Sequence, residues 1–208
     1  MNSPIHFSAG RDTYDNCPLQ IVVDDFRALV EHIETHPGAK KGLNYVCGPM
    51  SFGPHDRTDK YPQEAHYRLA SHAKPCSFLT LDIDYMNGAD VQAAVLNEIE
   101  GLCSYAYETA SSTPEVPRMR VLIALNRDVS RHERIALGTA FQKQLETKLA
   151  AKLGCAAIEF DQSVYRPEQP NYNPTIGARS WKVWPLRAAA RPYCRLGGKF
   201  QHGLWHWG

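Results

Sequence analysis

The sequence lacks the features of a secreted or membrane-anchored protein. None of its apolar runs approaches the roughly 18 residues that mark a membrane-spanning helix, and we find no signal peptide at the N-terminus. Its 6 cysteines are scattered, with no Cys-x-x-Cys pair, which argues against a zinc ribbon or a disulfide framework. We therefore expect a cytoplasmic protein that does not interact with membranes.

The chain also lacks a large excess of either charge, with a formal net charge of +1. The average hides an asymmetry, because no acidic residue follows Glu168 and all 4 tryptophans lie after that position. Interleaved cations and aromatic side chains are typical of a path for single-stranded nucleic acid. We therefore predict DNA binding by cations of this C-terminal segment, with a basic surface whose tryptophans complete the core as the alternative; the residues are Arg187, Arg191, Arg195 and Lys199.

From residue 77 to residue 165 the pattern predicts the order β-α-β-β-α-β. Ser130 and Glu133 form a capping box that begins a long helix, and Gly154 ends it. This order is that of the ferredoxin-like fold, which is also the topology of the RNA-recognition motif (RRM). The predicted strands cover 78–83, 104–109, 118–125 and 156–165, and the other predicted helix begins at 89.

The residues before this core predict a second, smaller unit. A helix over 24–35 and a buried strand over 43–49 follow a polar, turn-rich beginning, and 50–65 is predicted to be a loop. We predict an α+β fold in which an RRM-like core packs on an N-terminal α/β unit. The expected divisions, within one compact domain, are 1–76 for the N-terminal unit, 77–178 for the catalytic core and 179–208 for the basic, Trp-rich segment.

The stretch FLTLDIDYMNG places Asp82 and Asp84 at the end of an apolar strand. Residues two apart on a strand share a face, and two adjacent carboxylates repel each other unless a positive charge lies near. In the predicted topology this strand is antiparallel to the one that begins with Arg118 and Arg120. The four side chains form either a plain ion-pair cluster or a divalent-cation site whose bound polyphosphate the arginines clamp.

A third acid in the last strand would complete a metal site. IEFDQS offers Asp161, with Glu159 on the same face, and simple register does not decide which of the two reaches the aspartate pair.

Three segments resemble the archaeo-eukaryotic primase superfamily, in the primase-polymerase branch carried by phages, plasmids and integrated elements. They are FLTLDID, YETASSTPEVPRMRVLIAL and FDQSVYRPEQPNYNP, and the likeness covers roughly residues 40–175. The resemblance implies a nucleotidyltransferase that joins NTPs or dNTPs on a single-stranded DNA template, using two Mg²⁺ or Mn²⁺ ions. Its implied metal ligands and catalytic residues are Asp82, Asp84 and Asp161.

The sequence departs from that superfamily in one motif. Most members have Ser-x-His on the third strand of the core, where the histidine contacts the nucleotide phosphates, and Arg120 occupies roughly that place here. A helicase domain often follows such primases, so a replicative helicase is an expected partner. Further nucleotide-binding candidates, beside Arg118 and Arg120, are Lys41, Arg166, Gln169 and Tyr172; the alternatives for them are a solvated strand flank and a polar loop held by prolines.

Two other functions compete with the primase-polymerase hypothesis. A metal-dependent nuclease or replication-initiation enzyme of the relaxase type would need a His-x-His cluster near a nucleophilic tyrosine, and we find none in the sequence. A non-catalytic module that binds single-stranded nucleic acid would carry aromatic residues on its central strands. Here those strands carry aspartate and arginine instead.

Arg68 is expected on the surface of a helix.

Overall fold

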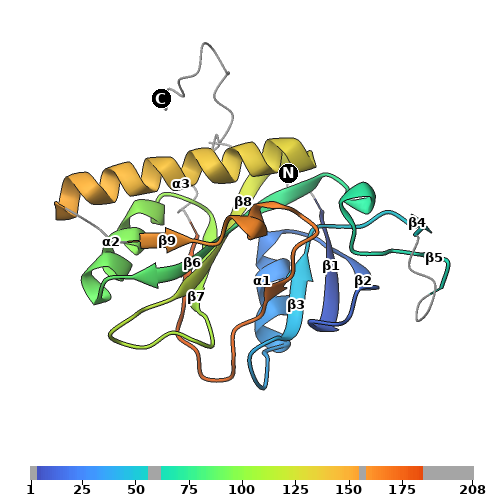
Figure 1. The fold of residues 1–208 in the computed structure, drawn as a ribbon, viewed down its shortest axis with the longest axis horizontal. Coiled ribbons are helices and arrows are strands. Elements are labelled where there is room, and N and C mark those ends of the chain that lie inside the picture. The colour runs from blue at the N-terminus through green and yellow to red at the C-terminus, as the bar shows by residue number, and fades with distance from the viewer. Residues whose placement is uncertain (1–3, 56–61, 155–157, 185–208) are drawn as a thin grey trace, which may run out of the picture.

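Two antiparallel sheets and the helices packed on them form the computed structural model, which describes residues 4–55, 62–154 and 158–184 (Figure 1). A five-stranded sheet and a four-stranded sheet lie at opposite ends of an elongated molecule, and the longest helix runs along one side of it. Within these residues no helix is long and apolar enough to cross a membrane. The predicted DNA-binding cations Arg187, Arg191, Arg195 and Lys199 lie outside the described residues.

The five-stranded sheet confirms the predicted β-α-β-β-α-β order. Its neighbouring strands are all antiparallel, in the order β11-β7-β8-β6-β9, which is the ferredoxin-like arrangement with β11 added at one edge. The elements are β6 (Cys76–Met86), α2 (Ala89–Ile99), β7 (Ser104–Glu108), β8 (Met119–Val129), α3 (Arg131–Leu153), β9 (Ile158–Phe160) and β11 (Ser180–Val183).

One face of this sheet is covered by α2 and α3. Leu79, Leu81 and Ile83 alternate along β6 and point toward these helices, where they are at most 1% exposed. The expected capping box is present, because the Ser130 hydroxyl accepts from the Glu133 N–H while the Glu133 carboxylate accepts from the Ser130 N–H. Asp82 is thereby directed to the opposite face, and the alternation breaks at the register shift between Ile83 and Tyr85, after which Met86 is again buried in the helix-side core.

The four-stranded sheet belongs mainly to the N-terminal unit and has the order β10-β3-β1-β2. Its strands are β1 (Ile5–Asp12), β2 (Leu19–Val23), β3 (Leu43–Cys47) and β10 (Asn171–Tyr172), and α1 (Phe26–Thr35) packs on it. Because β10 comes from the far end of the chain, the sheet joins segments on both sides of the core. The remaining elements are β4 (Gly53–Pro54), β5 (Glu64–Ala65) and the 3₁₀ turns η1 (Ala70–His72) and η2 (Gln162–Tyr165).

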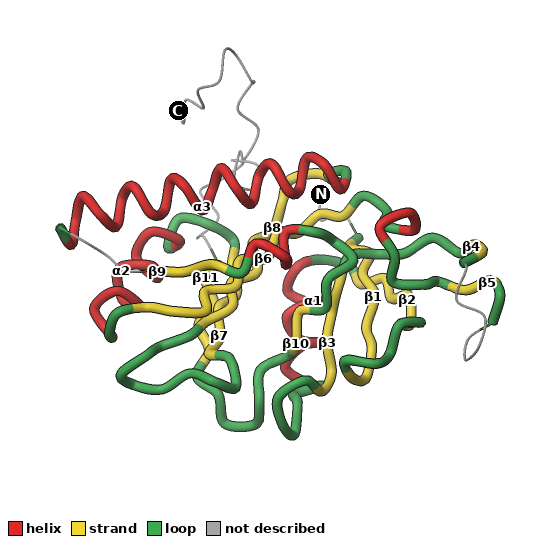
Figure 2. The backbone as a smooth tube through the Cα atoms, in the orientation of Figure 1, coloured by secondary structure: helices red, strands yellow, loops and turns green. Residues whose placement is uncertain are grey.

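Helix α1 lies between the two sheets and connects their cores (Figures 1 and 2). Its buried residues Leu29 and Ile33 belong to one cluster with Phe7 of β1 and with Tyr105 and Leu122 of the larger sheet. Each side chain fully buried in such a cluster contributes about 1.5–3 kcal/mol relative to its exposed state. The open face of the larger sheet is therefore covered over β7 and β8, while its end near Asp84 is left outside this cluster.

Four expectations for local structure were wrong. The beginning of the chain is not simply turn-rich, because Ile5, Phe7 and Ala9 alternate inward and make β1, which pairs with β2. Within the described part of the predicted strand, 158–165, only β9 is extended, since the Asp161 carboxylate accepts from the Ser163 N–H and the chain turns into η2. The predicted loop over 50–65 contains the short pair β4–β5, and Arg68 lies in no helix.

Candidate functional site

A row of polar side chains crosses the larger sheet at the end of β6. Asp82 is the cross-strand partner of Arg120 on β8, and Arg120 is in turn the partner of Tyr107 on β7. On the other side of β6, the backbone N–H of Asp161 donates to the carbonyl of Asp82 over 2.9 Å. The topology thus brings four distant segments to one line, with three carboxylates at one end of it when Asp84 is included.

The centre of the row is a buried ion pair. The Nη2 of Arg120 donates to Oδ2 of Asp82, and the two residues are only 7% and 5% exposed. The Nη1 of Arg120 donates to the backbone carbonyl of Tyr172 over 2.8 Å, and the Tyr107 hydroxyl donates to the same carbonyl over 2.7 Å. Because Tyr172 is in β10, this polar group fastens the smaller sheet to the larger one.

The environment of the pair keeps its charges in place. Burial alone would lower the pKa of Arg120, but the adjacent Asp82 carboxylate and Tyr107 hydroxyl raise it above its ordinary value. For Tyr107, burial outweighs the nearby guanidinium and raises the pKa to about 12. Arg120 is therefore charged and Tyr107 is a neutral hydrogen-bond donor throughout the physiological pH range.

Asp82 and Asp84 retain unused capacity for a cation. The Oδ1 of Asp82 is buried and has no hydrogen-bond partner among the described residues. Asp84 is exposed, and its pKa is raised, first by desolvation of its carboxyl group and then by the charges of Asp82 and Asp161, with Arg118 and Arg120 opposing the shift. A divalent cation would give the orphaned oxygen a partner and relieve the repulsion among the three carboxylates.

Asp161 is held next to the pair by a small supporting structure. Its carboxylate accepts from the Ser163 N–H over 2.8 Å and from the Ser163 hydroxyl over 2.7 Å. The fully buried Arg134 of α3 donates to the carbonyls of Val164 and Tyr165 and to that of Phe78 on β6. The turn that carries Asp161 and the strand that carries the aspartate pair are thus fastened to the same guanidinium.

A glycine in α3 allows this close approach. A Cβ built on Gly138 would lie 2.5 Å from the Tyr165 ring, so only glycine lets the ring pack directly on the helix. The Tyr165 hydroxyl then donates to Gln142 over 2.8 Å.

In the described residues, no group of three or more His, Cys, Asp or Glu side chains is arranged to hold a metal ion. Two of the three candidate ligands are engaged elsewhere, since Asp82 is paired with Arg120 and both oxygens of Asp161 accept from Ser163. Glu159, the alternative third acid, is exposed and lies opposite Tyr85, one position beyond Asp84. Carboxylate oxygens suit Mg²⁺ or Mn²⁺ in their chemistry, while the described side chains are not arranged as a formed metal site.

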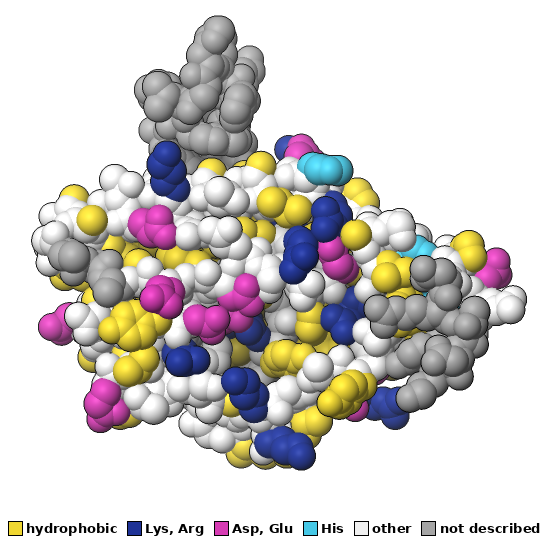
Figure 3. Space-filling model, in the orientation of Figure 1, with side chains coloured by type: hydrophobic (Ala, Val, Ile, Leu, Met, Phe, Trp, Pro, Cys, Tyr) yellow, Lys and Arg dark blue, Asp and Glu magenta, His cyan; other side chains and the backbone are white. Residues whose placement is uncertain are grey.

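Two cations, Arg118 and Lys41, contact the loop between β7 and β8. Arg118 influences Asp84, and its backbone N–H donates to the Ser112 hydroxyl in the loop between β7 and β8. Lys41, in the turn before β3, donates to the Ser111 hydroxyl of the same loop over 3.2 Å. Figure 3 shows several acidic side chains near the middle of the face it presents, with most of the lysine and arginine side chains to their right and below.

The other predicted nucleotide-binding residues are spread around η2 and β10. Arg166 follows η2 and donates through Nε to the Ser163 carbonyl, and the Gln169 N–H closes the next turn on Arg166. Tyr172 presents its backbone to Arg120, while its hydroxyl donates to Thr13 over 3.0 Å. Sequence reasoning missed Tyr107, Ser163 and Arg134; for the first, the alternation of Tyr105 and Tyr107 in a predicted strand was the available signal.

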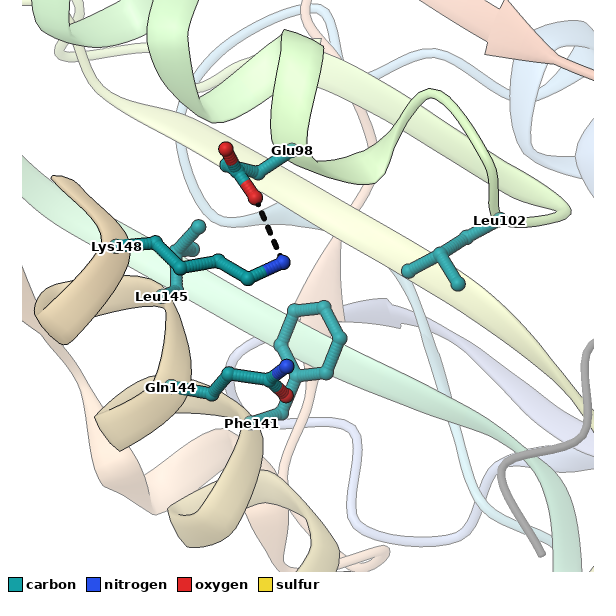
Figure 4. Close-up of a pocket in the computed structure, with 6 residues that line it drawn as sticks. All are labelled: Glu98, Leu102, Phe141, Gln144, Leu145 and Lys148. Carbon is teal, nitrogen blue, oxygen red and sulfur yellow. Dashed lines mark ion pairs between the residues drawn. The ribbon is translucent and has the colours of Figure 1, made fainter. Parts of the chain in front are cut away.

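A hollow of about 400 Å³ lies away from these residues, between α2 and α3 (Figure 4). It is lined by Leu102, Phe141 and Leu145, with the Glu98–Lys148 ion pair at 2.9 Å beside them. Because these helices cover the face of the sheet opposite Asp82, the hollow is separate from the carboxylate site.

The fold and the polar row define a class, an α+β protein whose RRM-like sheet carries carboxylates and arginines where an RNA-binding sheet carries aromatic residues. The family model described as the VapE N-terminal domain matches residues 66–186, more than half of the chain. The chain therefore belongs to the family of VapE N-terminal domains.

Two further comparisons concern individual proteins. A search of the curated proteins finds no match. Among solved structures, the fold is similar to the polymerase domain of ligase D from Mycobacterium tuberculosis in complex with DNA, with 14% sequence identity and a TM-score of 0.39. The similarity covers 81% of this chain and 57% of that one, so the present chain spans little more than half of that neighbour's length.

Proposed function

We propose that this protein is a DNA-directed primase-polymerase, a nucleotidyltransferase that makes primers or extends DNA during replication of a mobile element. The observation that carries the proposal is the buried Oδ1 of Asp82, which has no hydrogen-bond partner among the described residues and lies beside Asp84 and Asp161. Membership of the VapE N-terminal domain family supports a replication-related role.

The proposed cofactor is Mg²⁺ or Mn²⁺, held as a two-metal site by Asp82, Asp84 and Asp161. When bound, it would neutralise charge on the reacting phosphate, which is the main contribution of metal ions to such transfers. Arg118 and Lys41 are the first candidates to bind the nucleotide triphosphate, because the charge of Arg118 acts on Asp84 and the exposed Lys41 reaches the loop that leads into Arg118. Arg166, Gln169 and Tyr172 are the proposed further contacts.

Arg120 has a different position in this proposal. Two of its nitrogens are already bound, to Asp82 and to the Tyr172 carbonyl, and it is buried. Its contribution to nucleotide binding therefore passes first through the orientation of Asp82, and direct contact with a phosphate requires it to leave that carboxylate.

The proposed partners are a single-stranded DNA template, NTPs or dNTPs, and a replicative helicase domain or protein. The C-terminal cations Arg187, Arg191, Arg195 and Lys199 remain candidates for DNA binding. Their test is the salt dependence of affinity, since about 0.7 units of slope are expected for each phosphate contact on a single strand.

The decisive experiment is incubation with a single-stranded template, labelled NTPs or dNTPs, and Mn²⁺ or Mg²⁺, with products resolved by length. Template-dependent products that require the metal, and that disappear in Asp84→Asn, support the proposal. Absence of products with both nucleotide classes and both metals, from a protein that is folded by circular dichroism, contradicts it.

A second candidate is a non-catalytic module for single-stranded nucleic acid. It is favoured by the engagement of Asp82 with Arg120 and of Asp161 with Ser163, which gives both carboxylates a structural role without metal. That candidate predicts template binding with no incorporation and no stabilisation by Mn²⁺, so the same experiment separates the two.

A further inference from the structure

The turn between β1 and β2 presents a large aromatic side chain to solvent. Tyr14 is 82% exposed, the highest fraction among the large hydrophobic side chains of the described residues. The side chain of Arg11, at the start of the same turn, is 90% exposed, and its nearest ion-pair partner is Asp15 at 3.8 Å. An exposed pair of this kind contributes little, so Arg11 remains available to another anion.

This turn lies beside a second cationic turn at the same end of the smaller sheet. Asp12 of β1 pairs with Leu43 at the start of β3, and a Cβ on Gly42 would lie 3.2 Å from the Thr13 hydroxyl. The exposed Lys40 and Lys41 precede that glycine. We define the hairpin edge as this end of the sheet, made up of Arg11, Tyr14, Lys40, Lys41 and Tyr172.

The hairpin edge is continuous with the carboxylate site. The Tyr172 hydroxyl donates to Thr13, while its backbone carbonyl accepts from Arg120. Lys41 reaches Ser111, in the loop that precedes Arg118. Figure 1 shows the β1–β2 turn, the turn before β3 and the loop between β7 and β8 along the same border of the molecule.

The acids of this turn are used to build it. Asp12 Oδ1 accepts from the N–H groups of Tyr14 and Asp15, and Asp15 accepts from those of Arg11 and Cys17. Arg68 donates to Asn16 over 2.8 Å on the inner side. The turn therefore has a fixed backbone that holds Tyr14 and Arg11 outward, which reduces the entropy lost on binding.

We propose that the hairpin edge binds single-stranded nucleic acid, with a base stacked on Tyr14 and backbone phosphates on Arg11 and Lys40. A cationic groove with aromatic platforms is the general design for such strands, because every base has a π-face and every nucleotide has a phosphate. Under the proposed function, the hairpin edge would be the path by which a template reaches Asp84, and in this sense the inference rests on that function. Its test measures binding alone and does not depend on catalysis.

The test measures affinity for fluorescent single strands of DNA and of RNA, by anisotropy, in EDTA and without nucleotides. Tyr14→Ala should weaken binding about fivefold or more, and Tyr14→Phe, which keeps the ring, should bind normally. The double change Arg11→Gln and Lys40→Gln should flatten the slope of log affinity against log salt by about 1.4. The DNA and RNA arms identify which strand the edge prefers.

Matched controls come from exposed residues elsewhere on the surface. Phe52→Ala removes an aromatic side chain that is 60% exposed, and Lys143→Gln removes an exposed cation of α3; neither should change affinity or slope. Normal binding by Tyr14→Ala together with an unchanged slope in the double variant overturns the inference. Loss of binding in these variants, with no incorporation by the parent protein, leaves the inference standing and removes only the proposed catalysis.

Discussion

Asp82 and Asp84 lie two residues apart on the same strand, yet their environments are opposite. Asp82 is 5% exposed and paired with the buried Arg120, which also fastens β10 to the larger sheet. Asp84 is exposed, and its nearest charges include two other carboxylates. The Asp-x-Asp motif thus combines Asp82, whose charge is compensated inside the protein, with Asp84, which lies at the surface.

The difference between the two aspartates explains how a proposed metal ligand can be buried in a stable protein without a bound cation. Arg120 compensates the charge of Asp82, so the strand can fold with an aspartate inside it. Among the described residues Asp84 makes no ion pair, and its pKa is raised first by desolvation of the carboxyl group and then by the charges of Asp82 and Asp161. If Asp82 and Asp84 bind metal together, the cation would give Oδ1 of Asp82 a partner and would relieve the repulsion between the carboxylates at Asp84.

The largest effect is expected from Asp82→Ala. The change should lower the free energy of unfolding by about 3–5 kcal/mol, because it leaves the Arg120 guanidinium buried without its partner. Incorporation should fall by orders of magnitude, through loss of both a ligand and the fold around it. Chemical denaturation and primer-extension assays measure the two consequences separately.

A double variant separates the effect on stability from the effect on incorporation. Asp82→Leu with Arg120→Met replaces the pair by apolar side chains, and the Tyr172 carbonyl keeps its bond from Tyr107. Most of the lost stability should return while incorporation remains absent. A double variant as unstable as Asp82→Ala would show that the ion pair is not what makes Asp82 important for folding.

Asp84→Asn should abolish incorporation as strongly but without destabilising the protein. Because the folded-state pKa of Asp84 is raised, wild-type protein is penalised as the pH rises through that pKa, and the penalty is absent at about pH 3 where the group is protonated in both states. The variant should therefore have a slightly higher Tm than wild type at pH 7 in EDTA, and an equal one at about pH 3.

The change in Tm on addition of Mn²⁺ should distinguish Asp84→Asn from the wild-type protein in a second way. Mn²⁺ should raise the Tm of the wild-type protein in proportion to the logarithm of its concentration, and should leave that of Asp84→Asn unchanged. Equal stabilisation of both proteins by Mn²⁺ would place the metal elsewhere.

The fold of the larger sheet could be predicted from sequence because its signals are local. The capping box at Ser130, the apolar stripe of α3 and the apolar runs of β6 and β8 each appear within about a dozen residues. β10 could not be found in this way, since Asn171 and Tyr172 become a strand only by pairing with β3, far away along the chain. β1 was missed because its alternation of Ile5, Phe7 and Ala9 is short and contains Ser8 and Gly10, which are residue types common in turns.

The candidate site was also predictable only in part. The type and spacing of Asp82, Asp84, Arg118 and Arg120 are visible in the sequence, and an antiparallel register follows from the topology. Which arginine is buried is not visible, because it depends on Tyr107 and on the carbonyl of Tyr172. Arg134 could not be identified from the sequence either, because its type and position resemble those of a surface residue of a helix. In the structure it donates to the carbonyls of Val164 and Tyr165, in the turn that follows Asp161.

The two arginines of β8 should differ as the two aspartates do. Arg118→Gln should raise the nucleotide KM about tenfold, equivalent to one charged hydrogen bond, with little change in kcat or in stability. Arg120→Gln should instead destabilise the protein, since Asp82 is then buried without its cation. Steady-state kinetics with each variant, alongside thermal melts, tests the difference; the reverse pattern would assign the triphosphate to Arg120.

The smallest predicted effect concerns Ser163 and decides whether Asp161 is a ligand. Ser163→Ala removes the hydroxyl that donates to Asp161 Oδ2 over 2.7 Å, while the backbone N–H of residue 163 still donates to Oδ1. Stability should fall by about 1 kcal/mol, the usual net contribution of one hydrogen bond. If Asp161 binds metal, Oδ2 of the variant can bind Mn²⁺ without first giving up the hydrogen bond from Ser163. The Kd for Mn²⁺ should then fall by up to about fivefold. Calorimetric titration with Mn²⁺ measures this opposite movement of stability and affinity, whereas an unchanged Kd in a destabilised variant would reduce Asp161 to the residue that caps η2.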